Sequence, residues 1–179
     1  MFRRARRLFR GGPPPVPPLL RQAHRMMEAG DFNNAAIAFH DLAKKAEDFA
    51  PERSPALYAE AGRASLLGGD PKKAVAHFRS ALTLLGSQQR FHRMERLGQR
   101  IIHELREHGR NAEADEIAQV LKNNVPQTKD NEPTAISTPK PILPTHCPSC
   151  GAAVRPDEVD WLDEMTAECD YCGSPVRAE

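Results

Sequence analysis

The four cysteines of this 179-residue chain are the residues whose type and spacing point most directly to chemistry. They form two Cys-x2-Cys pairs, Cys147 with Cys150 and Cys169 with Cys172, with 18 residues between the pairs and a glycine after each. Each pair can offer two sulfurs to one metal ion, and the glycine permits the tight turn that this requires. The spacing therefore predicts one structural Zn²⁺ bound by four thiolates, which leave no open position for a catalytic water.

The segment that carries these cysteines resembles a zinc ribbon, in which two such pairs are joined by a β-hairpin. The expected strand residues are Val159, Trp161, Met165 and Ala167. So few apolar residues form too small a core, and metal binding, worth an apparent ~10–16 kcal/mol in peptides, would supply the folding energy. Two disulfides are the competing interpretation, and the lack of a secretory signal argues against them. A rubredoxin-like iron site with a redox function stays open, because the same four sulfurs can hold iron.

A long segment with few prolines precedes the ribbon and must form the larger part of the fold. Glycine recurs in it at Gly30, Gly69 and Gly109, at spacings of 39 and 40 residues, with alanine and large apolar residues at similar offsets after each. A repeat of this length is typical of stacked helix pairs. Each glycine is expected to end one helix in the left-handed conformation, and Asp or Asn to cap the next. The prediction is a mainly α protein with six helices in three repeats, an α-solenoid.

The repeat resembles the tetratricopeptide repeat, most closely in LYAEAGRASLLGGDPKKAVAHFRSALTLL. There Gly62 takes the small position of the first helix, and Ala74 and Phe78 lie in the second. The resemblance implies a groove that binds a protein or peptide and is lined by the first helix of each repeat. Carried over position by position, it implies a mostly basic groove suited to an acidic partner, formed by Arg21, His24, Glu60, Arg63, Arg96, Arg100 and His103.

Composition divides the chain into four parts. Residues 1–18 form a basic and Pro-rich tail, residues 19–123 the helical domain, and residues 146–179 the zinc ribbon. Residues 124–145 are rich in Pro, Asn and Thr without periodicity, so we expect a disordered linker. Such a linker would let the ribbon move independently of the helices.

The net charge of +1 hides a strong segregation of charge along the chain. Residues 146–179 hold eight acidic residues against Arg155 and Arg177, a net charge of −6, and four thiolates on one Zn²⁺ add about −2. Because binding to phosphates requires Lys and Arg, the ribbon is expected to meet a protein rather than nucleic acid. A nucleic-acid-associated zinc-ribbon factor remains an alternative function.

The first ten residues hold five arginines and no acidic residue. Three interpretations stay open for them: a disordered basic tail, a segment in peripheral contact with an anionic membrane, and an Arg-rich organellar presequence. No apolar run approaches the ~20 residues of a membrane-spanning helix. We therefore expect a cytoplasmic protein, with membrane-peripheral contact through residues 1–10 as the variant.

Catalytic motifs are absent from the sequence: there is no glycine-rich phosphate loop, no H-E-x-x-H and no G-x-S-x-G. The expected function is that of a non-enzymatic adaptor or scaffold for protein–protein interaction. A basic groove and an acidic ribbon on one chain further predict that the ribbon, or an acidic partner peptide competing with it, occupies the groove.

Overall fold

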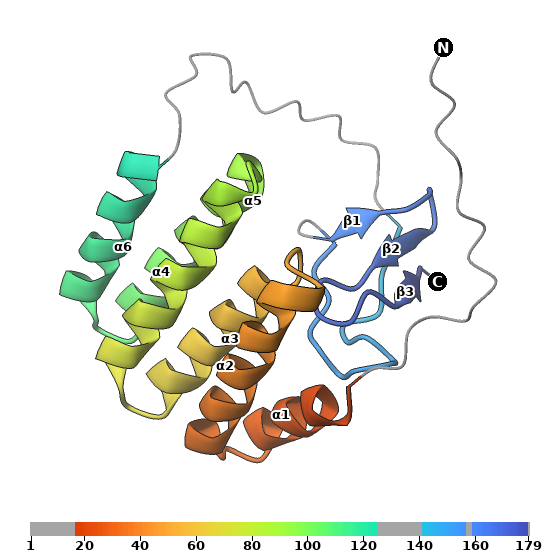
Figure 1. The fold of residues 1–179 in the computed structure, drawn as a ribbon, viewed down its shortest axis with the longest axis horizontal. Helices are drawn as coiled ribbons and strands as arrows, with labels where there is room; N and C mark the ends of the chain where they lie inside the picture. Colours follow the sequence, from red (N-terminus) through yellow and green to blue (C-terminus); the bar gives the residue numbers. More distant parts are fainter. Residues whose placement is uncertain (1–16, 125–140, 157–158, 179) are drawn as a thin grey trace, which may run out of the picture.

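The computed structural model describes residues 17–124, 141–156 and 159–178, and the first of these stretches contains six helices. The helices lie side by side in chain order, from α1 at one end to α6 at the other (Figure 1). Each of α1–α5 packs against the helix that follows it, and α4 also contacts α6. In chain order they are α1 (Pro18–Glu28), α2 (Phe32–Phe49), α3 (Ser54–Leu67), α4 (Pro71–Ser87), α5 (Phe91–Glu107) and α6 (Asn111–Asn124).

The helix ends follow the predicted glycine repeat. Gly30, Gly69 and Gly109 all have positive φ, between 70° and 82°, a conformation that costs glycine little. Asp70 caps α4 as expected, because its carboxylate accepts a hydrogen bond from the amide of Lys73 at 3.1 Å. Ser54 is followed by proline as Asp70 is, but it does not cap α3, because it is the first residue of that helix and is buried.

Ser54 differs from a cap because its hydroxyl has another partner. Its Oγ donates to the carbonyl of Ala43 in α2 at 3.0 Å, so it ties α3 to the preceding helix. A hydroxyl with no water around it needs such a partner. The sequence pattern is that of an exposed cap, and only the packing of α2 on α3 shows that the position is interior.

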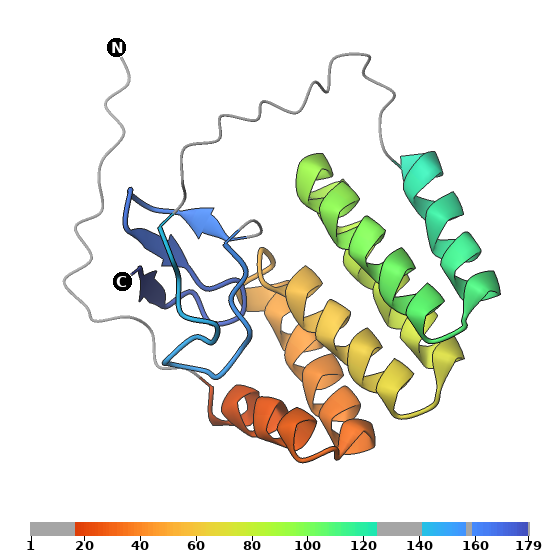
Figure 2. The same cartoon turned by 180° about the vertical axis from the view of Figure 1, so that it is seen from behind.

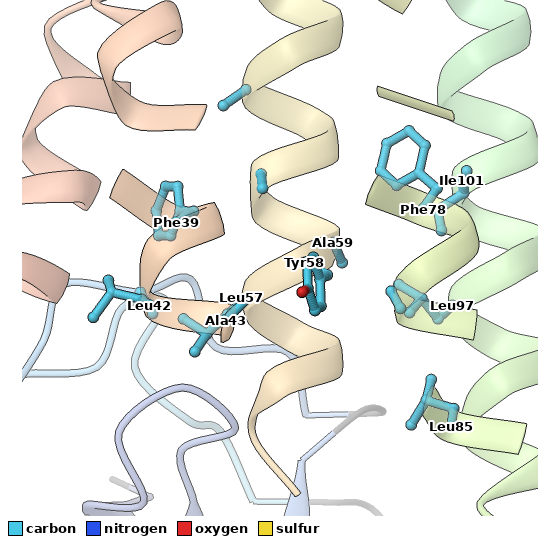
Figure 3. Close-up of a cluster of buried hydrophobic side chains, with 14 of the residues drawn as sticks. Phe39, Leu42, Ala43, Leu57, Tyr58, Ala59, Phe78, Leu85, Leu97 and Ile101 are labelled. Carbon is cyan, nitrogen blue, oxygen red and sulfur yellow. The ribbon is translucent and has the colours of Figure 1, made fainter. Parts of the chain in front are cut away.

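Small residues set the close approach of the helices, as the repeat predicted. Ala35, Ala74 and Ala114, at equivalent positions after the three glycines, are fully buried. Gly62 of α3 faces the ring of Phe78 in α4, and a Cβ at that position would lie 2.5 Å from the ring. The large side chains that fill the remaining core include Phe39, Leu57, Phe78, Leu85 and Ile101 (Figure 3).

A small antiparallel sheet lies near the cysteines. Its order is β1-β2-β3, with β1 at Asp160–Trp161, β2 at Thr166–Glu168 and β3 at Pro175–Arg177. Of the expected strand residues, Trp161 pairs with Ala167, whereas Val159 and Met165 flank the strands. The sheet has a third strand that a two-strand hairpin lacks, because Val176 pairs with Ala167 and is buried.

The described part of residues 146–179, called the ribbon after its predicted fold, packs against the helices. It lies beside α1–α3, and the two views agree on this placement (Figures 1 and 2). Buried residues of the ribbon and of the helices belong to one continuous core cluster. Leu143 is already buried, so the packed segment begins before His146. Residues 125–140 of the expected linker and residues 1–16 of the expected tail lie outside the described residues.

Candidate metal centre and its contact with the helices

The four predicted ligands converge on one point. The sulfurs of Cys147, Cys150, Cys169 and Cys172 all lie within 4.8 Å of one another, and all four residues are buried. The pairs Cys147–Cys172 and Cys150–Cys169 are both separated by 3.8 Å between sulfurs. A tetrahedral centre with metal–sulfur bonds of about 2.3 Å has sulfur–sulfur edges of about 3.8 Å. The arrangement can hold one metal ion, and within the described residues it is the one such cluster.

Two loops of the same design deliver the sulfurs. In the first knuckle (residues 147–151), the amide of Gly151 donates to the carbonyl of Cys147 at 2.9 Å. In the second knuckle (residues 169–173), the amide of Gly173 donates to the carbonyl of Cys169 at 2.8 Å. Both glycines have positive φ, 82° and 68°, which explains why the sequence places glycine directly after each pair.

The sulfurs are thiols or thiolates, and the cysteines are free. A disulfide would need a sulfur–sulfur distance near 2.05 Å. Hydrogen bonding between the neighbouring sulfurs lowers the pKa of Cys147 and raises the pKa of Cys150. Four thiolates within 4.8 Å of one another would repel each other, and a divalent metal ion among them supplies the positive charge that balances this repulsion.

Tyr171, between the two ligands of the second knuckle, connects the metal centre to the helices. Its hydroxyl donates to the carboxylate of Glu60 in α3 at 2.9 Å. Its ring meets the ring of His24 in α1 edge to face, with centroids 5.6 Å apart. Burial, reinforced by the charge of Glu60, raises the pKa of Tyr171 well above its ordinary value, so the phenol keeps its proton and remains a donor.

Two ion pairs join the helices to acidic residues that precede this tyrosine. Asp170 pairs with Arg93 of α5, and Glu168 pairs with Arg53, which precedes α3, at 3.9 Å. The first pair is the better shielded, since its side chains are 20% and 17% exposed. The second knuckle thus offers acidic groups to basic residues of the helices, as the segregation of charge predicted. We call His24, Arg53, Glu60 and Arg93 together the docking face.

His24 is the docking-face residue of α1 and lies near both knuckles. Its ring contacts Phe39 of α2 and Tyr171, and its Cβ lies close to the backbone at Gly151. Burial lowers the pKa of His24 against the opposing charge of Glu60, so the neutral imidazole is favoured. His24 therefore serves as packing between the helices and the metal centre.

The other residues of the predicted groove have different surroundings. Arg63 pairs with Glu104 at 2.9 Å and with Glu60 at 4.0 Å, so its charge is already balanced within the helices. His103 is exposed and pairs with Glu107 at 3.4 Å. That these two residues bind a partner stays a prediction.

Arg96 and Arg100 do face the ribbon. They line a cavity of about 400 Å³ between α3, α5 and the second knuckle, with Tyr171 and Asp170 on its opposite side. Arg21 lines a second cavity, beside the first knuckle, together with His24. The structure therefore brings five of the seven candidate groove side chains to the ribbon: Arg21, His24, Glu60, Arg96 and Arg100.

Sequence reasoning missed Tyr171, Asp170, Arg53 and Arg93 as contact residues. One available signal was the Asp-Tyr pair inside the second Cys-x2-Cys. A module this small has too small a core to bury a large aromatic side chain, so the tyrosine is expected to pack against another part of the chain. The first knuckle carries Pro and Ser at the same positions, which indicates that the two knuckles face different surroundings.

Comparison with known proteins adds no relative. No family model matches this chain, and no curated protein and no solved structure matches it either. None of the helices in the described part of the chain combines the length and the apolar character needed to cross a membrane.

Proposed function

We propose that this protein is a non-enzymatic adaptor for protein–protein interaction, built from a tetratricopeptide-like helical array and a zinc ribbon with one structural Zn²⁺. The observation that carries the metal part is the set of four buried sulfurs within 4.8 Å of one another, with 3.8 Å edges that suit tetrahedral coordination. Thiolates at all four positions fill the coordination sphere. The ion would hold the knuckles in shape without activating a water.

The adaptor part rests on the docking face. This face already holds a polypeptide segment, the second knuckle, through an ion pair, a tyrosine hydrogen bond and aromatic contact. Surfaces of helix pairs that bind one segment in this way are suited to binding segments of other proteins. An acidic protein or peptide is the proposed partner. The acidic ribbon argues against nucleic acid.

Metal analysis tests the structural assignment and separates it from the redox alternative. Protein purified from cells grown with both metals should be colourless and contain one zinc per chain. A red protein that contains one iron per chain would favour a rubredoxin-like redox site instead.

Affinity purification with the full chain as bait tests the adaptor role. The matched bait is the variant Arg96→Glu/Arg100→Glu, which reverses the charge of two residues in the cavity that Arg93 of the docking face also lines. A partner that uses this surface should be captured by the wild type and lost with the variant. Identical captured sets would contradict the proposed surface.

A further inference from the structure

The docking face contacts two residues of the second knuckle and the residue just before it, each through a different side chain. Arg93 pairs with Asp170, Glu60 accepts a hydrogen bond from the hydroxyl of Tyr171, and Arg53 pairs with Glu168, the last residue of β2. These contacts amount to recognition of an acidic segment in which Asp directly precedes Tyr.

We propose that the docking face is a binding site for an acidic Asp-Tyr segment of a partner protein, and that the chain's own second knuckle occupies it as a competing ligand. This inference rests on the proposed adaptor function and names the chemistry of the partner. The partner segment places its Asp on Arg93 and its tyrosine hydroxyl on Glu60, in place of Asp170 and Tyr171.

The tyrosine must be unmodified. Glu60 is only 13% exposed and accepts a hydrogen bond from the phenol hydroxyl, so a matching ligand must bring a hydrogen-bond donor to this point. A phosphotyrosine would bring a charge of about −2 and three acceptor oxygens to a carboxylate. The site therefore rejects a more acidic ligand, which a merely basic surface would bind more tightly.

The aspartate supplies orientation. Arg93 and Asp170 are both largely shielded from water, so their charges are weakly screened and the direction of the contact is well defined. Arg53 and Glu168 are farther apart, at 3.9 Å, and Glu168 is 41% exposed, so this outer pair contributes less. The core of the recognised segment is thus Asp-Tyr, with an acidic residue two positions before the Asp.

Competition follows from the covalent connection between the knuckle and the helices. A tethered segment acts at an effective concentration near millimolar, so an external peptide meets an occupied site in the wild type. The variant Tyr171→Ala removes the central contact of the resident segment and leaves all four sulfur ligands in place. It should weaken the hold of the resident segment on the docking face, so that an external peptide competes more easily, while the metal stays bound.

The experiment measures binding of fluorescein-labelled Ala-Glu-Ala-Asp-Tyr-Ala to the metal-loaded full chain by fluorescence anisotropy. We expect at least tenfold tighter binding to Tyr171→Ala than to the wild type. Adding Glu60→Gln to that background should weaken binding at least fivefold. The matched control is Glu107→Gln, an exposed carboxylate of α5 that pairs with His103, and it should leave the affinity unchanged. Circular dichroism checks that each variant keeps its helices.

A peptide panel distinguishes recognition from simple charge attraction. Replacing the peptide tyrosine with Phe or its Asp with Asn should each weaken binding severalfold, and phosphotyrosine should weaken it further. Tighter binding of the phosphopeptide, equal affinity for wild type and Tyr171→Ala, or no binding up to millimolar peptide would each overturn the inference. None of these results would alter the zinc content or the capture of a partner by another surface, so the proposed function can survive them.

Full chain treated with a chelator in reducing buffer provides a second released form. Without the metal the second knuckle loses its shape, and the same peptide should bind as it does to Tyr171→Ala. If Tyr171→Ala proves unstable, the chelator-treated chain is used in its place. Metal-free chain that keeps its helical content but does not bind the peptide would count against the inference.

Discussion

Arg93 of α5 and Asp170 of the second knuckle form an ion pair whose side chains are only 20% and 17% exposed. The two residues belong to parts of the chain that composition alone separates by a linker. Because few water molecules reach the pair, each charge depends on the other for its stabilisation. The helices and the ribbon are therefore coupled in stability.

Replacing Arg93 with Ala should lower the free energy of unfolding by roughly 1.5–3 kcal/mol, the usual contribution of a hydrogen bond to a charged group. Urea denaturation of the metal-loaded chain measures this. Arg79→Ala is the control, because Arg79 pairs with Glu116 at 3.0 Å but both are about half exposed, 57% and 48%. That pair should contribute less than ~1 kcal/mol. If Arg93→Ala and Arg79→Ala lower the free energy of unfolding equally, the proposed coupling of helices and ribbon is contradicted.

Replacing Cys169 with Ser should remove the metal and also destabilise the helices. The substituted residue directly precedes Asp170 and Tyr171, so the loss of the knuckle removes their contacts with Arg93 and Glu60. We expect zinc below one tenth per chain by elemental analysis and a lower melting temperature of the helical signal. The control variant Ser149→Ala, in the first knuckle, should keep both its zinc and the wild-type melting temperature. An unchanged helical transition in Cys169→Ser would show that the ribbon is independent after all.

Gly62→Ala should destabilise the protein by about 1–3 kcal/mol although alanine favours helices. The new Cβ would lie 2.5 Å from the ring of Phe78, which is buried and has no room to move. Gly86→Ala in α4 is the matched helical control, since its Cβ would meet only Met94 at an ordinary 3.5 Å. The control should gain up to ~1 kcal/mol. A denaturation midpoint that falls in Gly62→Ala and rises in Gly86→Ala, each relative to the wild type, would confirm the close approach of α3 and α4.

The stability of the helices should fall as the pH decreases below about 6.5, in part through His77. Burial, together with the nearby His40 and Lys73, lowers the pKa of His77, whereas Asp70 opposes the shift. A histidine with a lowered pKa in the folded state binds fewer protons than it does when unfolded. Its contribution is therefore fully present above its unfolded pKa, near 6.5, and is lost as the pH falls toward the folded pKa.

Urea denaturation at pH 7.5, 6.5 and 5.5 tests this dependence. His77→Gln should lose less stability between pH 7.5 and 5.5 than the wild type does. The difference in free energy of unfolding between the wild type and His77→Gln at pH 7.5 serves as the reference, because at that pH His77 is neutral in both the folded and the unfolded state. A variant that follows the wild-type slope would assign the pH dependence to other groups.

Features with local signals could be predicted from the sequence. Gly30, Gly69 and Gly109 mark helix ends because the left-handed conformation is a property of a single residue. The two Cys-x2-Cys pairs predict the cluster because the loop that presents each pair is shaped within five residues of sequence. The finer assignment to tetratricopeptide repeats remains a prediction, as does the identity of the metal.

Features that depend on distant packing could not be predicted. Ser54 has the sequence context of a cap, and only α2 makes it interior. Arg63 was assigned to the groove by its position, and the neutralising Glu104 comes from α5. The hypothesis that the ribbon occupies the basic groove rested on net charge, and net charge carries no information about which side chains meet, so the contacts of Tyr171 and Asp170 could not be predicted.

The hydrogen bond from Tyr171 to Glu60 closes a span of 111 residues, and this has a consequence for biosynthesis. At a translation rate of about 5–20 residues per second, α3 leaves the ribosome roughly 6–22 s before its partner on the second knuckle. During that interval Glu60 and Arg93 face the cellular milieu without the knuckle. The nascent chain is thus the first form of the protein in which this surface is open. A partner with an acidic Asp-Tyr segment would meet the open surface at this stage, before the second knuckle covers it.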